Sequence, residues 1–217
     1  MTRTVDDETG AVPARSASFE RFAGVCAVLA GVSGFLYAVA FVVLQDELLS
    51  GLFLMLVGLL TSVALLAVYE RLRETDASFA LLALVLGVAG SLGSAVHGGY
   101  DLANAINPPS SMPDLPNPVD PRGLLTFEVA GAALFVVSWL IRRGEQFPGG
   151  LGYLGYLSAI LLLALYLGRL IVFDPTNPVI LVPALLNGFL INPIFYLWLG
   201  LALLRGRTVR EARTGAS

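Results

Sequence analysis

Three polar residues at helical spacing stand in an otherwise apolar stretch. His97, the only histidine of the chain, is followed by Asp101 and Asn104. Offsets of four and three residues place these side chains on one face of a helix. An imidazole and a carboxylate inside a membrane span are costly, so we expect this face to bind or relay something, or to pack against polar partners.

The composition indicates that the surrounding elements are membrane spans. Hydrophobic residues make up 56% of the 217 positions and charged residues only 13%, whereas a soluble domain holds about a quarter charged residues. About 20 apolar residues in a helix cross the hydrocarbon core. We therefore predict an all-α bundle of six transmembrane helices at about 22–44, 48–69, 79–105, 123–141, 151–173 and 179–204.

The distribution of arginine predicts the orientation. All thirteen basic residues are arginine, and eleven of them lie before the first span, after the last span, or in the second and fourth loops, all on one side. By the positive-inside rule, both termini are cytoplasmic and the protein belongs to the plasma membrane. We divide the chain into a disordered tail (1–18), a six-helix domain (19–205) and a second cytoplasmic tail (206–217).

Prolines mark two special segments. Six of the twelve prolines fall between Asn107 and Gly123, which predicts a stiff, extended connection over the outer face. Pro183 and Pro193 lie within the last span and predict a kink there.

Further polar residues are expected at the same depth in the membrane as His97. If the third and fifth helices run outward and the fourth and sixth run inward, residues of four helices meet in the outer half of the membrane. Small residues on these helices, such as Gly87 and Gly90, allow close approach. The predicted ligand-binding site or buried polar network consists of His97, Asp101, Asn104, Glu128, Tyr166, Arg169, Asn187 and Asn192.

Charge balance predicts an ion pair in this layer. Arg169 keeps its charge and needs an acceptor in a low-dielectric setting, for which Glu128 and Asp101 are the candidates. His97 or a proton would balance the second carboxylate. Such a network either fixes helix packing or binds a ligand, and the sequence leaves both open.

Other motifs favour ordinary explanations. The glycines at 150, 152 and 155 open a membrane helix without a preceding strand, so they indicate turn and packing rather than a dinucleotide site. Ser94, His97 and Asp101 lie on one helix face, which is unsuited to a hydrolase triad. A single histidine excludes a two-histidine zinc site, although a mixed site with Glu128 stays a weaker alternative. We predict no metal, no cofactor and no nucleic-acid partner.

Three runs carry a resemblance to a known group. They are ERFAGVCAVLAGVSG (20–34), RRGEQFPGGLGYLG (142–155) and INPIFYLWLG (191–200). With them the chain resembles small multi-pass bacterial and archaeal membrane proteins that are grouped as a domain of unknown function. The resemblance implies no activity and adds no catalytic residue.

Three functions remain open. The first is an uncharacterised multi-pass membrane protein whose outward-facing polar cavity binds a small polar solute or a lipid headgroup. The second is a structural or regulatory membrane subunit, with a homo-oligomer left open, in which the charges only hold helices together. The third is a membrane-embedded enzyme with His97 as acid or base, although the sequence favours a protein without enzymatic activity.

Overall fold

The computed structural model describes residues 17–109, 120, 122–172, 174 and 176–205. Residues 1–16 and 206–217 of the predicted tails, and most of the predicted proline-rich connection, lie outside the described residues. Within the described part the protein is all-α.

Six continuous helical segments of the described chain are long and apolar enough to cross a membrane. This confirms the prediction of six helices that are long and apolar enough to be membrane spans. The elements are α1 (Ala17–Ala38) with η1 (Val39–Leu44), α2 (Glu47–Leu72), α3 (Ala77–Ile106), η2 (Leu124–Val129) with α4 (Ala130–Arg143), α5 (Gly149–Ile171), α6 (Pro178–Leu186), η3 (Asn187–Ile191) and α7 (Asn192–Arg205). The three η segments are π-helical turns.

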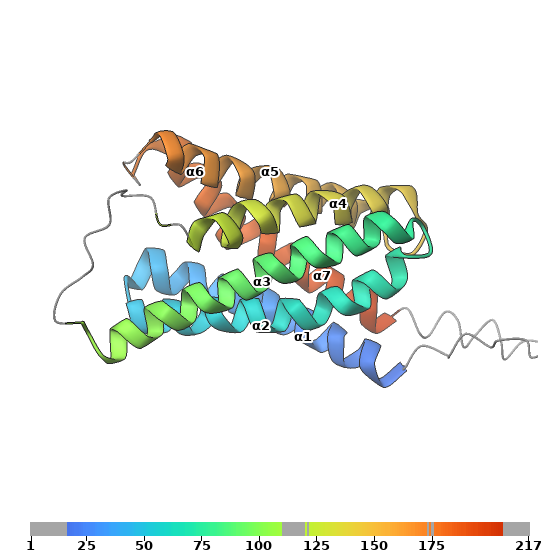
Figure 1. Ribbon diagram of the computed structural model, residues 1–217, viewed down its shortest axis with the longest axis horizontal. Coiled ribbons are helices and arrows are strands. Elements are labelled where there is room, and N and C mark those ends of the chain that lie inside the picture. Colours follow the sequence, from blue (N-terminus) through green and yellow to red (C-terminus); the bar gives the residue numbers. More distant parts are fainter. Residues whose placement is uncertain (1–16, 110–119, 121, 173, 175, 206–217) are drawn as a thin grey trace, which may run out of the picture.

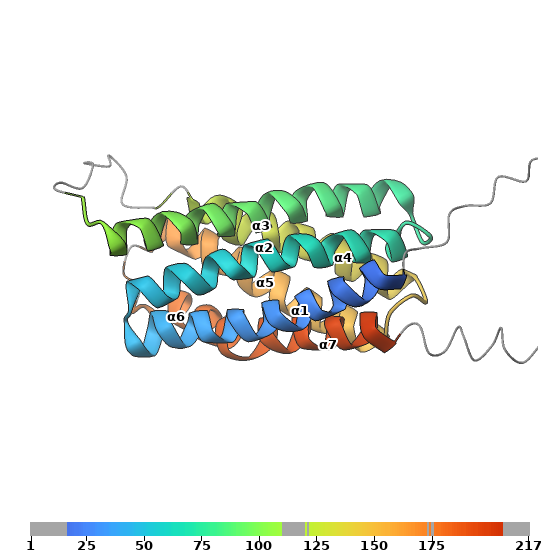
Figure 2. The same cartoon turned by 90° about the horizontal axis from the view of Figure 1, so that it is seen from below.

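The helices form a closed ring. α1 packs against α2, α2 against α3, α3 against α4 and α4 against α5, and α5 contacts α6 and α7, which returns to α1. Figures 1 and 2 show the helices lying along one common axis. The start of α1 and the end of α7 lie at the same end of the bundle (Figure 1). We call this the terminal end, and the opposite end, with Gln45 and the start of η2, the distal end.

Short polar residues define where the helices begin. The Asp46 carboxylate accepts a hydrogen bond from the Leu49 amide at 2.9 Å, and Asp76 accepts from the Ser78 and Phe79 amides at 3.1 Å. These side chains satisfy amides that a helix start leaves without partners. Gln45 precedes α2 with a φ of 53°, and this left-handed backbone makes the tight turn from η1 into α2.

The last span changes its hydrogen bonding between its two prolines. Pro183 lies inside α6, and the π-helical turn η3 follows before Pro193 near the start of α7. Proline removes a backbone donor, and a π turn is a common local adjustment to that loss. The structure thus has a π turn between the two prolines, and the kink predicted for this helix stays a prediction.

Glycine brings α3 close to its neighbours. A Cβ on Gly90 would lie 2.9 Å from Cα of Ala130 in α4, and one on Gly51 of α2 would lie 2.6 Å from the Leu102 amide nitrogen of α3. A Cβ on Gly98 would overlap the Met55 amide nitrogen and the Gly51 carbonyl. Without Cβ atoms the helix backbones pack directly, as small residues allow in membranes.

Arg71 joins the helices at the terminal end. Its Nε donates to Glu20 Oε1 at 2.6 Å, and its Nη atoms donate to the carbonyls of Ala202 and Leu203 at 3.2 and 3.1 Å. Its guanidinium lies 5.0 Å from the ring centre of Phe147. The arginine thus ties α1 and α2 to carbonyls that the end of α7 leaves unpaired. In the sequence, Arg71 served only as one of the positive charges that predict which side of the membrane is cytoplasmic.

The close packing of α2 and α3 predicts different effects at adjacent glycines. Gly98→Ala should lower the free energy of unfolding by about 2 kcal/mol, because its methyl group overlaps fixed backbone atoms of α2. Gly99→Ala meets only the Met55 sulfur, at 3.8 Å. It should be neutral or stabilising by up to about 1 kcal/mol. Denaturant unfolding in detergent measures both, and equal effects would contradict this view of the interface.

A second prediction concerns Arg71. Arg71→Gln should lower the free energy of unfolding by about 3 kcal/mol, because it leaves the largely buried Glu20 carboxylate and two carbonyls without their partner. Arg73→Gln is the control, because the pair of Arg73 with Glu70 is exposed, at 3.4 Å, and should contribute less than about 0.5 kcal/mol. Thermal unfolding in micelles would contradict the prediction if the two variants melted alike.

Candidate functional site

A polar cluster joins the distal end of α3 to the start of the fourth span. It consists of His97 and Asp101 on α3, Asp120 and Arg122 before η2, and Thr126 within η2. We call these five residues the distal cluster. It contains two residues of the polar face predicted from sequence, His97 and Asp101 but not Asn104, together with three residues outside the predicted site.

Arg122 is the centre of the distal cluster. Its Nη1 donates to Asp101 Oδ1 at 2.8 Å, and its Nε donates to both oxygens of Asp120 at 3.0 Å. Its Nη2 makes a further hydrogen bond to Asp120, and its guanidinium lies 4.6 Å from the ring centre of Tyr100. One cation therefore faces two carboxylates and an aromatic ring.

The protonation of the two loop residues follows from this geometry. Partial burial works to raise the pKa of Asp120, but the hydrogen bonds and charge of Arg122 outweigh it and hold that pKa below its ordinary value. Burial disfavours the Arg122 cation, yet its bonds to Asp120 and Asp101 hold the pKa of Arg122 above its usual value. Both groups are thus charged around neutral pH.

Hydrogen bonding assigns the tautomer of His97. The Thr126 hydroxyl donates to the Arg122 carbonyl at 3.0 Å, so its hydrogen is already used. The contact of 3.2 Å between Thr126 Oγ1 and His97 Nδ1 then requires Nδ1 to donate. In the neutral imidazole Nε2 consequently carries the lone pair.

This tautomer turns acceptors toward one another. His97 Nε2 lies 3.5 Å from Asp101 Oδ2 and 3.6 Å from Asp120 Oδ2. Both separations exceed the usual range for an N–H···O hydrogen bond. A lone pair facing two carboxylates is unfavourable unless a hydrogen-bond donor lies between them or Nε2 itself is protonated.

The local backbone explains why Thr126 reaches the ring. Thr126 lies in the π-helical turn η2, and its buried hydroxyl caps the carbonyl of the residue four positions earlier. A π turn widens the helix and shifts the direction of its side chains, and such turns are frequent at functional sites. The distal cluster is still accessible at the surface of the bundle, because the side chains of Asp101 and Asp120 are 35% and 39% exposed.

The other predicted site residues lie apart from this network. Asn187 accepts a hydrogen bond from the buried Ser158 hydroxyl at 2.7 Å and so joins η3 to α5. The Tyr166 ring packs beside Gly123: a Cβ atom placed on Gly123 would lie 3.7 Å from the ring. Asn104 lines a separate cleft of about 690 Å³ between the end of α3 and the α1–α2 turn.

Glu128 and Asn192 complete the predicted set. Both are half-buried, on η2 and at the start of α7. Within the described residues neither side chain forms a hydrogen bond or an ion pair. Likewise, the described chain contains no group of three histidine, cysteine or acidic side chains suited to a metal ion.

The predicted ion pair of Arg169 is wrong in its partners. Asp101 pairs with Arg122, and among the described residues nothing pairs with Glu128. The physical reason is that depth along a helix says nothing about the direction in which a side chain points. Arg122 precedes its span and folds back over the end of α3, where long arginine side chains can reach polar partners.

The sequence held one usable signal for the missed residues. Arg122 is the single arginine in the loops assigned to the outer side, and Asp120 stands two positions before it. A lone cation on a side otherwise without arginine could have been weighed as a partner for Asp101. Thr126 had no distinguishing signal, because the π turn that aims it is a feature of the folded helix.

The corrected pairing predicts a double-mutant cycle. Asp101→Asn and Arg122→Gln should be coupled by about 1 kcal/mol, because the two side chains share an ion pair that is about one third exposed. Glu128→Gln and Arg169→Gln form the control cycle and should show no coupling. Unfolding in micelles measures all six variants, and coupling in the control cycle instead would restore the original pairing.

Comparisons with known protein families, curated proteins and solved structures find no match to this chain. They therefore identify no family. On its described residues the chain is a multi-pass membrane protein with six candidate spans.

Proposed function

We propose that this protein lies in the plasma membrane with both termini in the cytoplasm, and that its distal cluster binds a small ammonium-type cation from the outer side. The cation is either an amine solute or the amine of a lipid headgroup. The orientation is supported by the sequence, in which eleven of thirteen arginines belong to the side of the termini.

The observation that supports the proposal is that, among the described residues, Nε2 of the neutral His97 ring and Oδ2 of Asp101 have no donor between them, whereas Oδ2 of Asp120 already accepts from Arg122. Nε2 of the neutral ring and Oδ2 of Asp101 face each other across 3.5 Å, with Oδ2 of Asp120 at 3.6 Å. Arg122 donates to the other oxygen of Asp101. An ammonium group has three donors and could bridge acceptors arranged in this way.

The net charge of the distal cluster favours a cation as its ligand. Asp101 and Asp120 carry two negative charges, Arg122 carries one positive charge, and neutral His97 adds none, so the distal cluster has a net charge of −1. A phosphate or carboxylate would meet like charge, and the guanidinium that could hold it is already engaged by two carboxylates. A proton on His97 would also balance the charge and would compete with the ligand.

A structural role is the second candidate, and one observation favours it. Arg122 connects α3 to the segment before η2 through Asp101 and also donates to the His97 carbonyl at 3.4 Å. These bonds alone would hold the connection against the bundle. A purely structural cluster, however, predicts no change at His97 when an amine is added.

The single histidine makes a direct test feasible. With ¹⁵N-labelled histidine, the full chain in phosphatidylcholine nanodiscs gives one imidazole spin system, that of His97. Methylammonium at pH 7.5 should shift the Nε2 resonance in a saturable manner, and lowering the pH should weaken binding because the proton occupies Nε2. Sodium phosphate should cause no shift.

Two variants and one change of lipid complete the test. Asp101→Asn should weaken methylammonium binding by at least tenfold, whereas Glu47→Gln, an exposed carboxylate at the same end, should bind like wild type. A shift on replacing the lipid with phosphatidylethanolamine, without free amine, would identify a headgroup as the source. No methylammonium response, or an equal response to phosphate, would refute the proposal.

A further inference from the structure

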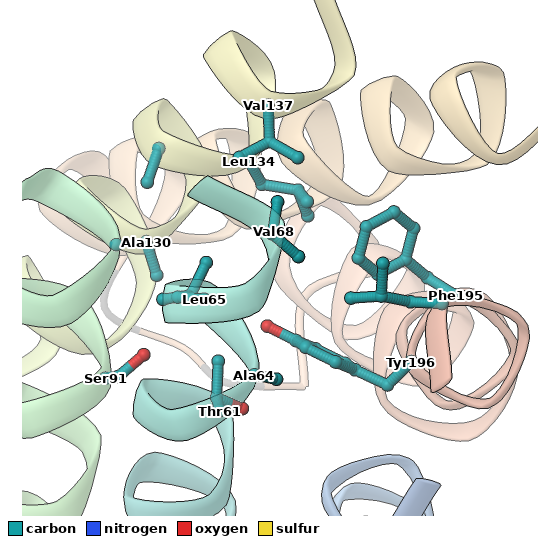
Figure 3. Close-up of a pocket in the computed structure, with 13 residues that line it drawn as sticks. Thr61, Ala64, Leu65, Val68, Ser91, Ala130, Leu134, Val137, Phe195 and Tyr196 are labelled. Atoms are coloured by element: carbon teal, nitrogen blue, oxygen red, sulfur yellow. The ribbon is translucent and has the colours of Figure 1, made fainter. Parts of the chain in front are cut away.

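A small cavity lies at the centre of the helix ring. It has a volume of about 30 Å³ and is lined by α2, α3, α4 and α7. Its walls are mainly apolar, with Leu65, Val68 and Leu134 among them. Figure 3 shows three hydroxyl groups in the same space, those of Thr61, Ser91 and Tyr196.

Thr61 is the unusual member of this group. It is 5% exposed, and its Oγ1 has no hydrogen-bond partner within the described residues. The Tyr196 hydroxyl lies close enough to interact with the Thr61 side chain, but the pair does not meet the geometry of a direct hydrogen bond. A buried hydroxyl without a partner costs about 1–3 kcal/mol, so this position calls for an explanation.

Neighbouring hydroxyls in the same helices are satisfied locally. Ser62 donates to the Gly58 carbonyl at 2.9 Å, and Ser94 donates to the Gly90 carbonyl at 3.1 Å. Thr61 and Ser91 have the same option of bonding to their own helix backbone. Neither does so in the described chain, and both open onto the cavity instead.

We propose that the cavity is a binding site for one or two ordered water molecules that bridge Thr61, Ser91 and Tyr196. A water needs about 10–15 Å³ of such space and two to four polar partners, and both conditions are met. Because the three hydroxyls belong to α2, α3 and α7, the water forms a hydrogen-bonded joint between the neighbouring helices α2 and α3 and helix α7, which is adjacent to neither of them in the ring. This site is separate from the distal cluster.

Water-edited solid-state NMR on the labelled full chain in lipid bilayers tests the proposal. Magnetisation from water should reach Thr61 Cβ and Ser91 Cβ at least threefold more strongly than Ser138 Cβ. Ser138 is a matched control, because it is fully buried and its hydroxyl donates to the Leu134 carbonyl at 2.7 Å. Signals from Thr61 and Ser91 no stronger than that of Ser138 would overturn the proposal.

Two variants show whether the hydroxyls hold the water. Thr61→Val keeps the shape of the side chain and removes its hydroxyl, so water transfer to Ser91 should fall by at least half. Tyr196→Phe should have the same effect, and it keeps the test available if the first variant does not fold. Unchanged transfer to Ser91 in a folded variant, or transfer from lipid acyl chains instead of water, would refute the bridging site.

Discussion

Polar groups inside a membrane have to find partners within the protein, and this constraint shapes the whole structure. Lipid offers no hydrogen bonds, so spans are helices and their irregular turns need local compensation. Two arginines meet the constraint at opposite ends of the bundle. Arg71 pairs with Glu20 and with carbonyls at the end of α7, while Arg122 pairs with Asp101 and Asp120 at the distal end.

The sequence predicted the architecture well, because the length of an apolar run is a direct measure of a span. Six helices that are long and apolar enough to cross a membrane are present. The site was only partly predictable. Helical spacing correctly grouped His97 with Asp101, but Arg122 and Asp120 lie outside the spans, where no periodicity indicates what they contact. The pairing predicted for Arg169 was wrong, because the sequence indicates how deep a residue lies along its helix but not the direction in which its side chain points.

Close packing and a closed ring have opposite consequences for the interior. Glycines let the backbones of α2 and α3 touch, which leaves no room for side chains between them. Around the whole ring, however, the side chains do not quite fill the centre, and a cavity of about 30 Å³ remains. Hydroxyl groups line this cavity, and without water in it Thr61 would lack a hydrogen bond.

The two arginines differ in the charge that remains after they pair with their partners. Arg71 uses its donors on one carboxylate and on neutral carbonyls, so the two charges balance. Arg122 meets two carboxylates, and the second negative charge has no counterpart while His97 is neutral. The second retains acceptors that a proton or an ammonium group can fill, and this difference is why we propose a binding function for the distal cluster and not for Arg71.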